Sequence, residues 1–336
     1  MIYTIVSILI INLLFIFFIK DISKFFNIND SSDGIRKFQS TPVSLLGGSL
    51  ILCNILISVI FNFILNDFNL FRDFIFTNRE TFAFLIGIIS FYLFGLFDDK
   101  YNLSANYKLI ISTFFLLFFV LLDNNLTISE LRFSFTEHKI DLKSFSIFFT
   151  ILCFLLFINA LNMFDGINCQ SGLYCILILS IFFFKNILAD FSLILIISLV
   201  FFLFLNYKNK IYLGESGVLI LSFIISYVFV KTYELNNNSF YVDEIFIIMF
   251  LPGVDMLRLF LTRIYNGKHP FSSDANHIHH LISKKFSTKK TFLLIFFYIF
   301  ITTLLYLNIQ FKVFLIFIYI AMYVLIIFFL TKKIPN

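Results

Sequence analysis

The sequence predicts an all-α, polytopic membrane protein with about eleven transmembrane helices. Hydrophobic residues make up 60% of the 336 positions and charged residues only 13%, whereas a soluble domain carries charge on roughly a quarter of its positions. The apolar residues gather in long runs, and a run of about 20 can cross the bilayer as a helix that pairs its own backbone polar groups. Together these observations exclude a soluble globular protein.

Polar residues, glycines and prolines separate the apolar runs. The candidate spans are residues 2–19, 43–65, 81–97, 107–122, 145–161, 171–184, 190–206, 212–230, 243–262, 292–308 and 312–331. The first lacks a basic start and a small-residue cleavage site, so we expect it to be a retained span. Pro252 and Gly253 predict a kink in the ninth. No soluble segment interrupts the series, so we expect residues 1–336 to form a single transmembrane domain.

Lys and Arg are distributed unevenly between the predicted loops. If the N-terminus lies outside and the spans alternate, seventeen of the 25 basic residues fall on the inner side, which predicts an outer N-terminus and a cytoplasmic C-terminus. Five polar stretches at span ends then face the cytoplasm, at 33–48, 97–108, 159–172, 206–217 and 255–280. A transporter or lipid flippase is the alternative, but transporters place ionisable residues near the membrane midplane. We therefore expect an interfacial active site.

Two adjacent carboxylates, Asp98 and Asp99, end the third predicted span. Such carboxylates repel each other, and Mg²⁺ is usually held by one or two carboxylates together with phosphate oxygens. An ordinary acidic loop is the alternative.

Glu215, between Gly214 and Gly217, opens the eighth span. Backbone N–H groups at such a helix start can meet a phosphate while the carboxylate holds a metal. Read alone, Glu215 could also be a favourable acid at a helix N-terminus.

Four polar residues recur every third position after the fifth span: Asn159, Asn162, Asp165 and Asn168. If this loop continues the helix, all four lie along one stripe. Amide groups on one face suit the hydroxyls of a sugar or the edge of a nucleobase. The alternative is a polar cap at the helix end, with Gly166 turning the chain.

Three of the five histidines, His277, His279 and His280, lie within four residues, close to Asp274 and downstream of Arg258. Imidazolium and guanidinium groups suit a pyrophosphate. Zn²⁺ is an alternative, but the chain offers no thiolate or closed ligand spacing for a structural zinc site. A basic loop attracted to anionic lipid accounts for residues 284–290, but not for the histidines.

Together, and in this order, these motifs resemble the polyprenyl-phosphate N-acetylhexosamine-1-phosphate transferase family, glycosyltransferase family 4, over essentially the whole chain. The histidine pattern is similar to the branch of undecaprenyl-phosphate N-acetylglucosaminyl-1-phosphate transferases. The matching elements are Arg36-Lys37, Pro42, Gly47-Gly48, Asp98-Asp99, 159–166, 214–217 and Asp274 with 277–280. The resemblance implies a multi-pass protein of the bacterial plasma (inner) membrane, with a periplasmic N-terminus and a cytoplasmic active site.

The resemblance also implies the reaction. N-Acetylhexosamine-1-phosphate would pass from a UDP-sugar to polyprenyl (undecaprenyl) phosphate with release of UMP, at the start of O-antigen or another envelope polysaccharide. The phospho-N-acetylmuramoyl-pentapeptide transferase of peptidoglycan synthesis is the alternative within the enzyme class. The implied cofactor is Mg²⁺, with Mn²⁺ as a substitute, and the partners are the two substrates and membrane lipid, without nucleic acid. The oligomeric state stays open, with a homodimer as one candidate.

Roles for individual residues follow from the same resemblance. Catalytic roles fall to Asp98, Asp99 and Asp165, with Asp98 accepting the proton of the lipid phosphate. Glu215 would ligate the metal together with Asp99, although the family usually has Asp at the position of Glu215. The expected substrate-binding residues are Lys37, Asn159, Asn162, Asn168, Arg258, Asp274, His277, His279 and His280.

Overall fold

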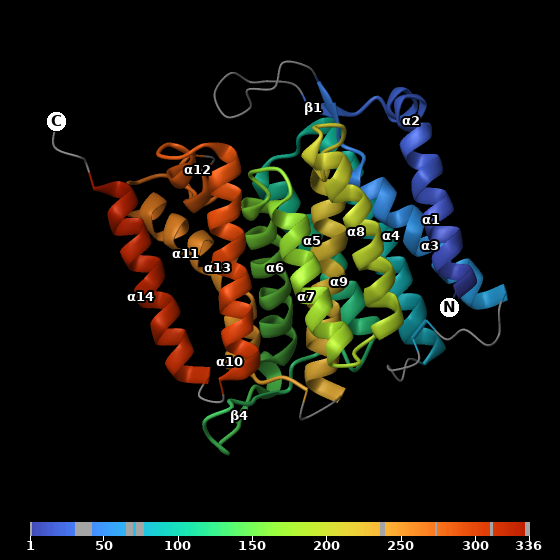
Figure 1. The fold of residues 1–336 in the computed structure, drawn as a ribbon. Coiled ribbons are helices and arrows are strands. Elements are labelled where there is room, and N and C mark those ends of the chain that lie inside the picture. Colours follow the sequence, from blue (N-terminus) through green and yellow to red (C-terminus); the bar gives the residue numbers. More distant parts are fainter. Residues whose placement is uncertain are drawn as a thin grey trace. The chain divides into compact units, whose positions relative to one another are not determined.

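The computed structural model describes residues 2–30, 42–64, 70–71, 77–235, 239–272, 274–309 and 312–332, and helices dominate it (Figure 1). Strands in the described residues are limited to two short antiparallel pairs. One joins β1 (Asn29–Asp30) to β2 (Val43–Ser44), and the other joins β3 (Glu130–Leu131) to β4 (Ile140–Asp141). The predicted all-α class is therefore confirmed.

Among the described residues, eight helices are long and apolar enough to cross a membrane, or up to ten if each of two bent pairs is one span. The eight spans are α3 (Gly47–Ile64), α4 (Asn78–Tyr101), α5 (Ala105–Leu122), α6 (Ser146–Phe164), α8 (Ala189–Tyr207), α9 (Gly214–Leu235), α13 (Thr288–Asn308) and α14 (Lys312–Thr331). The predicted sixth span coincides with α7 (Gln170–Phe184), whose 15 residues are fewer than these helices have. These helices support a polytopic membrane protein. The count of about eleven and the orientation of the termini stay predictions.

Two predicted spans are bent pairs of helices. The first combines α1 (Ile2–Phe17) and α2 (Ile19–Phe26) at 72°, and the ninth combines α10 (Val242–Ile248) and α11 (Phe250–Tyr265) at 81°. The kink predicted at Pro252 is thus confirmed, but the break lies at Met249, three residues earlier. Pro252 then falls in the first turn of α11, where a missing backbone N–H group removes no hydrogen bond of that helix.

The ends of α4 determine where its carboxylates lie. The helix begins at a capping box, in which the Thr77 N–H donates to Glu80 Oε2 at 2.8 Å and the Glu80 N–H donates to Thr77 Oγ1 at 3.3 Å. It ends at Asn102, which is left-handed with φ 51° and donates its N–H to the Asp98 carbonyl at 2.8 Å. The chain therefore leaves α4 just after the carboxylates and starts α5 at once, so Lys108 returns beside them.

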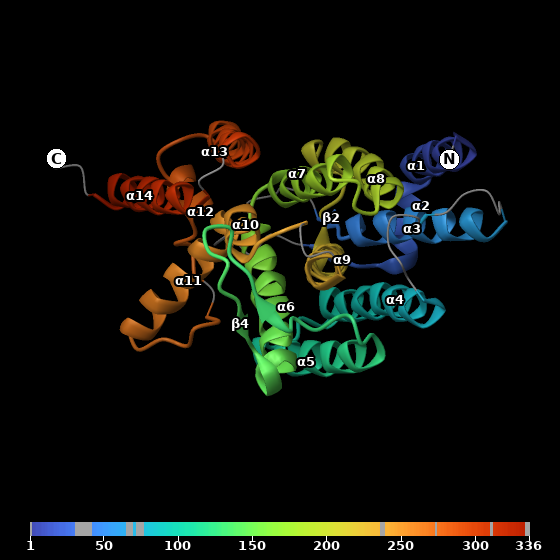
Figure 2. The same cartoon turned by 90° about the horizontal axis from the view of Figure 1, so that it is seen from below.

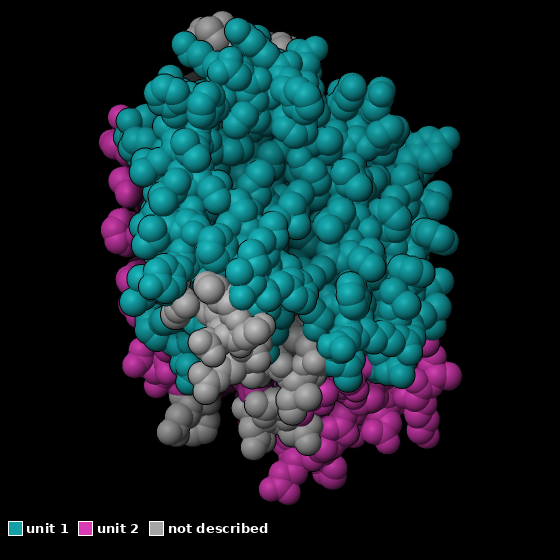
Figure 3. Space-filling view, turned by 90° about the vertical axis from the view of Figure 1, so that its right-hand side faces the viewer, with its two compact units in different colours: residues 1–124, 172–228 teal, residues 125–171, 229–336 magenta. Residues whose placement is uncertain are grey.

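The contacts group the chain into two compact units, coloured separately in Figure 3. Unit 1 contains residues 1–124 and 172–228, and unit 2 contains residues 125–171 and 229–336. In unit 1, α3 lies against α1, α4 and α8 (Figure 2). In unit 2, α6 packs against α11, and α14 contacts α10, α13 and the short α12 (Ile278–Ser283). The single-domain organisation of residues 1–336 stays a prediction.

Aromatic rings hold α4 against α9 in unit 1. The rings of Phe91 and Phe223 stack with centroids 4.8 Å apart, and those of Phe84 and Tyr227 lie 4.6 Å apart. All four side chains are buried. In lipid, helices associate mainly through close packing, because lipid tails are as apolar as the side chains. Interlocking rings supply that packing and keep the end of α4 beside the start of α9.

Candidate active site

In unit 1, three acidic residues and one lysine form a cluster that we call the carboxylate group: Asp98, Asp99, Lys108 and Glu215. Asp98 and Asp99 lie in the last turn of α4, Lys108 in the first turn of α5 and Glu215 in the first turn of α9. The Lys108 ammonium donates to Glu215 Oε1 at 2.8 Å and also forms an ion pair with Asp98 Oδ2. The structure thus brings the predicted catalytic pair together with the predicted metal ligand.

The carboxylate of Asp99, at the end of α4, lies against the N-terminus of α9. Its Oδ1 accepts a hydrogen bond from the Glu215 N–H at 2.7 Å, and its Oδ2 accepts one from the Ser216 N–H at 3.1 Å. A carboxylate is favourable there because it pairs unsatisfied backbone donors and faces the positive end of the helix dipole. We expected backbone N–H groups at this helix start to meet a phosphate. The N–H groups of Glu215 and Ser216 instead donate to Asp99.

Asp98 is oriented by the turn that follows it. Its Oδ1 accepts a hydrogen bond from the Leu103 N–H at 2.8 Å, and its Oδ2 faces Lys108. The Asp98 side chain is 1% exposed, whereas the side chains of Lys108 and Glu215 are 28% and 23% exposed. A buried carboxylate needs a compensating cation. Lys108 supplies that charge from the rim of the cluster.

Glycines allow the helices around the carboxylate group to approach each other closely. A Cβ atom on Gly95 of α4 would lie 2.4 Å from the Cα atom of Ser216 in α9. At the start of α3, the N–H groups of Gly47 and Gly48 donate to the carbonyls of Tyr212 and Leu213 at 2.9 and 3.1 Å. The predicted Gly47-Gly48 motif and Gly95 therefore position the start of α9.

In unit 2, the predicted amide stripe is only partly helical. α6 ends at Phe164, and Asp165 follows as its C-cap, so Asn168 lies beyond the helix. The stripe of four residues is therefore wrong beyond Asn162, because Gly166 and its neighbours turn the chain. The Asn159 amide donates to the Leu155 carbonyl in its own helix at 2.7 Å, and Asp165 accepts a hydrogen bond from the Ser171 hydroxyl in the first turn of α7.

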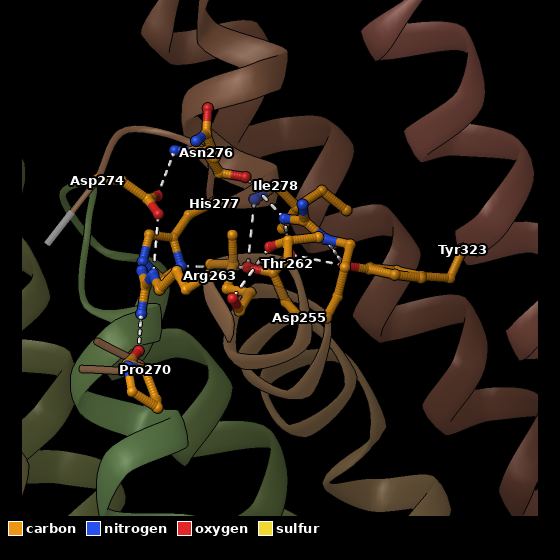
Figure 4. Close-up of polar contacts among 11 residues, drawn as sticks. Asp255, Thr262, Arg263, Pro270, Asp274, Asn276, His277, Ile278 and Tyr323 are labelled. Atoms are coloured by element: carbon orange, nitrogen blue, oxygen red, sulfur yellow. Dashed lines mark hydrogen bonds and ion pairs between the residues drawn. The ribbon is translucent and has the colours of Figure 1, made fainter. Parts of the chain in front are cut away.

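Asp255 is the centre of a polar network in unit 2, drawn in Figure 4. Its Oδ1 accepts hydrogen bonds from Arg258 Nη2 at 2.8 Å and from the Tyr323 hydroxyl at 2.7 Å. Its Oδ2 lies 3.2 Å from His277 Nδ1 and accepts from the Ile278 N–H at 3.3 Å. In the tautomer with hydrogen on Nδ1, His277 donates to Asp255 Oδ2, and this hydrogen bond orients the imidazole. Two predicted binding residues, Arg258 and His277, are thereby joined through Asp255.

Asp274 holds the chain that leads into the histidines. Its Oδ2 accepts from Arg263 Nε at 2.9 Å, and its Oδ1 accepts from the Asn276 N–H at 2.9 Å (Figure 4). Arg263 also donates from Nη1 to the Pro270 carbonyl at 2.7 Å. Burial raises the pKa of Asp274, but the hydrogen bonds from Arg263 and Asn276 outweigh burial and hold that pKa below its usual range. Asp274 therefore acts as an ionised anchor of this loop.

His279 connects the histidines to the turn after α6. A Cβ atom on Gly166 would lie 1.9 Å from His279 Nε2, so only glycine leaves room for the imidazole. His279 is 1% exposed, and neither ring nitrogen has a hydrogen-bond partner among the described residues. Its ring stacks on that of His277 at 5.3 Å and lies 4.3 Å from that of His280. Burial, followed by the charges of these two neighbours, lowers the pKa of His279 to about 3.

Comparison with known proteins shows which family the chain resembles. The model of glycosyl transferase family 4 matches residues 81–233. The undecaprenyl-phosphate alpha-N-acetylglucosaminyl 1-phosphate transferase of Escherichia coli O157:H7 is 25% identical over 302 residues, which cover 86% of this chain and 78% of that protein. The protein of the same name from Salmonella typhi is 23% identical over the same lengths. Residues 81–233 of this chain thus resemble glycosyl transferase family 4.

A further relative matches over a shorter stretch of the chain. The probable undecaprenyl-phosphate N-acetylglucosaminyl 1-phosphate transferase of Bacillus subtilis is 28% identical over 214 residues, or 61% of this chain and 59% of that protein. The resemblance predicted from the motifs is thereby confirmed. The segment that matches glycosyl transferase family 4 includes the whole carboxylate group and the residues from Asn159 to Asn168, whereas the histidines follow it.

The carboxylate group fits the Mg²⁺ that the family implies. Among the described residues no three His, Cys, Asp or Glu side chains converge on a point that could hold a metal. Asp98 and Glu215 nevertheless converge on one cation, the Lys108 ammonium. Mg²⁺ is usually held by one or two carboxylates and completes its coordination with water and substrate phosphates. Two carboxylate oxygens that already share a cation therefore provide donors of the kind that Mg²⁺ would need.

Sequence reasoning missed three residues of these clusters. Lys108 counted toward the predicted orientation and as the last residue of one polar stretch, Asp255 was one residue of another, and Tyr323 lay inside the last apolar span. A signal existed for Tyr323, since a tyrosine hydroxyl within a bilayer needs a hydrogen-bond partner. The predicted phosphate contact Lys37 lies outside the described residues, and its role stays a prediction.

Proposed function

We propose that this chain transfers N-acetylhexosamine-1-phosphate from a UDP-sugar to polyprenyl phosphate and releases UMP. The observation that carries the proposal is that Asp98, Glu215 and Lys108 come together from the end of α4 and the starts of α9 and α5. Such a cluster can hold a cation beside a diphosphate and supply a lysine to the same anion. The names of the relatives favour undecaprenyl phosphate as the acceptor and N-acetylglucosamine as the sugar.

The reaction needs no reactant besides the UDP-sugar and the lipid phosphate, because one bond to phosphorus forms as another breaks. An oxygen of the lipid phosphate attacks the sugar-bearing phosphorus of the UDP-sugar, and the bond from that phosphorus to the oxygen of UMP breaks. UMP leaves with that oxygen, and the product is a polyprenyl-diphosphate sugar. Bound Mg²⁺ would neutralise charge on the phosphate oxygens. Catalysis of this kind depends mainly on positioning and charge neutralisation.

By resemblance to the family, Asp98 is the residue to which we assign acceptance of the lipid phosphate's proton. A phosphate monoester has a second pKa of about 6, so at neutral pH most of the lipid phosphate has already lost that proton. We therefore assign Asp98 a role that is partly positional. Its Oδ1 is held by the Leu103 N–H and its Oδ2 faces Lys108, so its orientation is set before substrate arrives.

In unit 2, the histidines and Arg258 are the proposed contacts for nucleotide phosphates, and Asn162, Asp165 and Asn168 are the proposed contacts for sugar or base. Support comes from the hydrogen bonds that hold Arg258 and His277 in place through Asp255. Preorganised donors bind an anion without having to be ordered first. We also propose that the active site faces the cytoplasm of a bacterial plasma membrane, because the excess of Lys and Arg favours that orientation.

Purified protein with Mg²⁺, undecaprenyl phosphate and radiolabelled UDP-sugars tests the proposal. We expect UMP and a labelled lipid from UDP-N-acetylglucosamine or another UDP-N-acetylhexosamine. Labelled lipid from UDP-N-acetylmuramoyl-pentapeptide alone would instead identify the peptidoglycan-precursor transferase. If no UDP-sugar yields UMP while a known transferase is active in the same mixture, the enzymatic proposal is wrong.

A further inference from the structure

Lys108 and a divalent cation need the same two oxygen atoms. The Lys108 ammonium lies 2.8 Å from Glu215 Oε1 and pairs with Asp98 Oδ2. These oxygens belong to helices α4 and α9, and the lysine reaches them from α5. A cation held by both carboxylates would lie where the ammonium lies, because two cations cannot share that position without strong repulsion.

The other carboxylate of the group does not offer an equivalent place. Both oxygens of Asp99 accept backbone hydrogen bonds, from Glu215 and Ser216. Those bonds hold Asp99 at the end of α9 and reduce its freedom to turn toward a metal. Asp98 Oδ2 and Glu215 Oε1 instead pair with the Lys108 ammonium, which is a point charge on a flexible four-carbon stem.

Exchange of one cation for another preserves the charge balance of the cluster. Loss of Lys108 alone would leave the buried Asp98 carboxylate unpaired, which is strongly unfavourable. Entry of a divalent ion removes that penalty, and the Lys108 side chain, which is 28% exposed, already lies at the rim of the cluster. Lys108 then becomes available to an anionic ligand at the moment when the metal is in place.

We propose that the Lys108 ammonium competes with the divalent cation for Asp98 Oδ2 and Glu215 Oε1, so that metal binding releases Lys108 toward the diphosphate. This inference rests on the proposed function, since that function supplies the metal and the diphosphate. It goes further by making the lysine a resident counter-ion whose displacement couples the binding of metal to the binding of substrate.

Mn²⁺ binding to the purified protein, measured by electron paramagnetic resonance without any substrate, tests the competition. We expect Lys108→Gln to bind Mn²⁺ at least about tenfold more tightly than the unmodified protein, because a competing charge is removed. Lys108→Arg, which keeps the charge, should retain the weaker affinity. Lys100→Gln is the matched control, since Lys100 lies at the end of α4 with its ammonium over the Tyr101 ring, and it should leave Mn²⁺ binding unchanged.

A second measurement on the unmodified protein does not depend on how the variants fold. Acetylation of lysines by a water-soluble ester, followed by mass spectrometry, should show Lys108 becoming several-fold more reactive as Mn²⁺ is added, while Lys100 does not change. Unchanged Mn²⁺ affinity in a folded Lys108→Gln protein, or unchanged Lys108 reactivity at saturating Mn²⁺, overturns the inference. Neither measurement involves sugar transfer, so failure here is distinct from absence of UMP release.

Discussion

The hydroxyl of Tyr323, in the last helix, donates a hydrogen bond to Asp255 Oδ1 at 2.7 Å. Arg258 Nε in turn lies 2.7 Å from the Tyr323 hydroxyl, and Asp255 Oδ2 lies 3.2 Å from His277 Nδ1. Tyr323 therefore stabilises the carboxylate that orients His277. It connects α14 to the predicted phosphate-binding residues of unit 2 (Figure 4).

Tyr323→Phe should lower kcat/KM for the UDP-sugar about tenfold. A hydrogen bond to a charged group contributes about 1.5–3 kcal/mol, and its loss loosens Asp255 and, through it, His277 and Arg258. Tyr319→Phe is the matched control, because the Tyr319 hydroxyl donates to the Thr302 carbonyl instead. It should keep kcat/KM while changing thermal stability. Equal kcat/KM values for the two variants would show that Tyr323 has only a structural role.

Asp98→Asn and Glu215→Gln should each reduce UMP release at least about a hundredfold, because each removes a negative charge that holds the cation. Both substitutions keep the size of the side chain, and the amide oxygen introduced by Asp98→Asn could still accept the Leu103 N–H. Asp21→Asn, at an exposed acid in α2, controls for the general loss of one charge. Size-exclusion chromatography in detergent checks the folded state. Full activity in a folded variant would remove the assigned role from that residue.

Gly166→Ala should abolish or strongly reduce transfer and lower the free energy of unfolding by about 1–3 kcal/mol, as overpacking of a filled site does. The added Cβ would lie 1.9 Å from His279 Nε2, so the imidazole must move. Gly253→Ala is the control, since a Cβ on Gly253 in α11 meets nothing within 4 Å, and Ala favours helix. Thermal unfolding and UMP release measure both variants. A Gly166→Ala protein as active as Gly253→Ala would contradict the close packing.

Stability should fall between pH 6.5 and pH 5.5, in part because of His279. Its pKa is about 3 in the folded protein, below the ordinary value of 6.5, so the unfolded chain binds the proton more readily. The stabilisation is therefore complete above pH 6.5 and is lost as the pH falls toward 3. The loss amounts to about 1.4 kcal/mol at pH 5.5.

The comparison that isolates this contribution uses His279→Gln, which should show a smaller loss of stability between pH 7.5 and 5.5. His138→Gln, at an exposed position, should follow the unmodified protein. Circular dichroism in detergent suits the measurement, because the chain has no Trp. An identical pH dependence in His279→Gln would mean that His279 is not held neutral by burial.

Part of the carboxylate group could be predicted from the sequence. Asp98, Asp99 and Glu215 were predictable because each follows or opens an apolar run and stands out among apolar neighbours. Lys108 was not, because its partner Glu215 lies 107 residues away in the chain and no local pattern relates the two. The amide stripe failed for a local reason, since the helical period that placed Asn168 beside Asn162 stopped when α6 ended at Phe164.

The sequence by itself determined the helical membrane class, the positions of the spans and the places where polar residues interrupt them. It could do so because a bilayer demands long apolar runs whose backbone groups are paired within the helix, and both requirements are local. Only the tertiary structure decided which cation neutralises Asp98, which donors bind Asp99 and which tyrosine holds Asp255. Those pairings depend on how helices distant in the chain pack together, and close packing is a property of the whole fold.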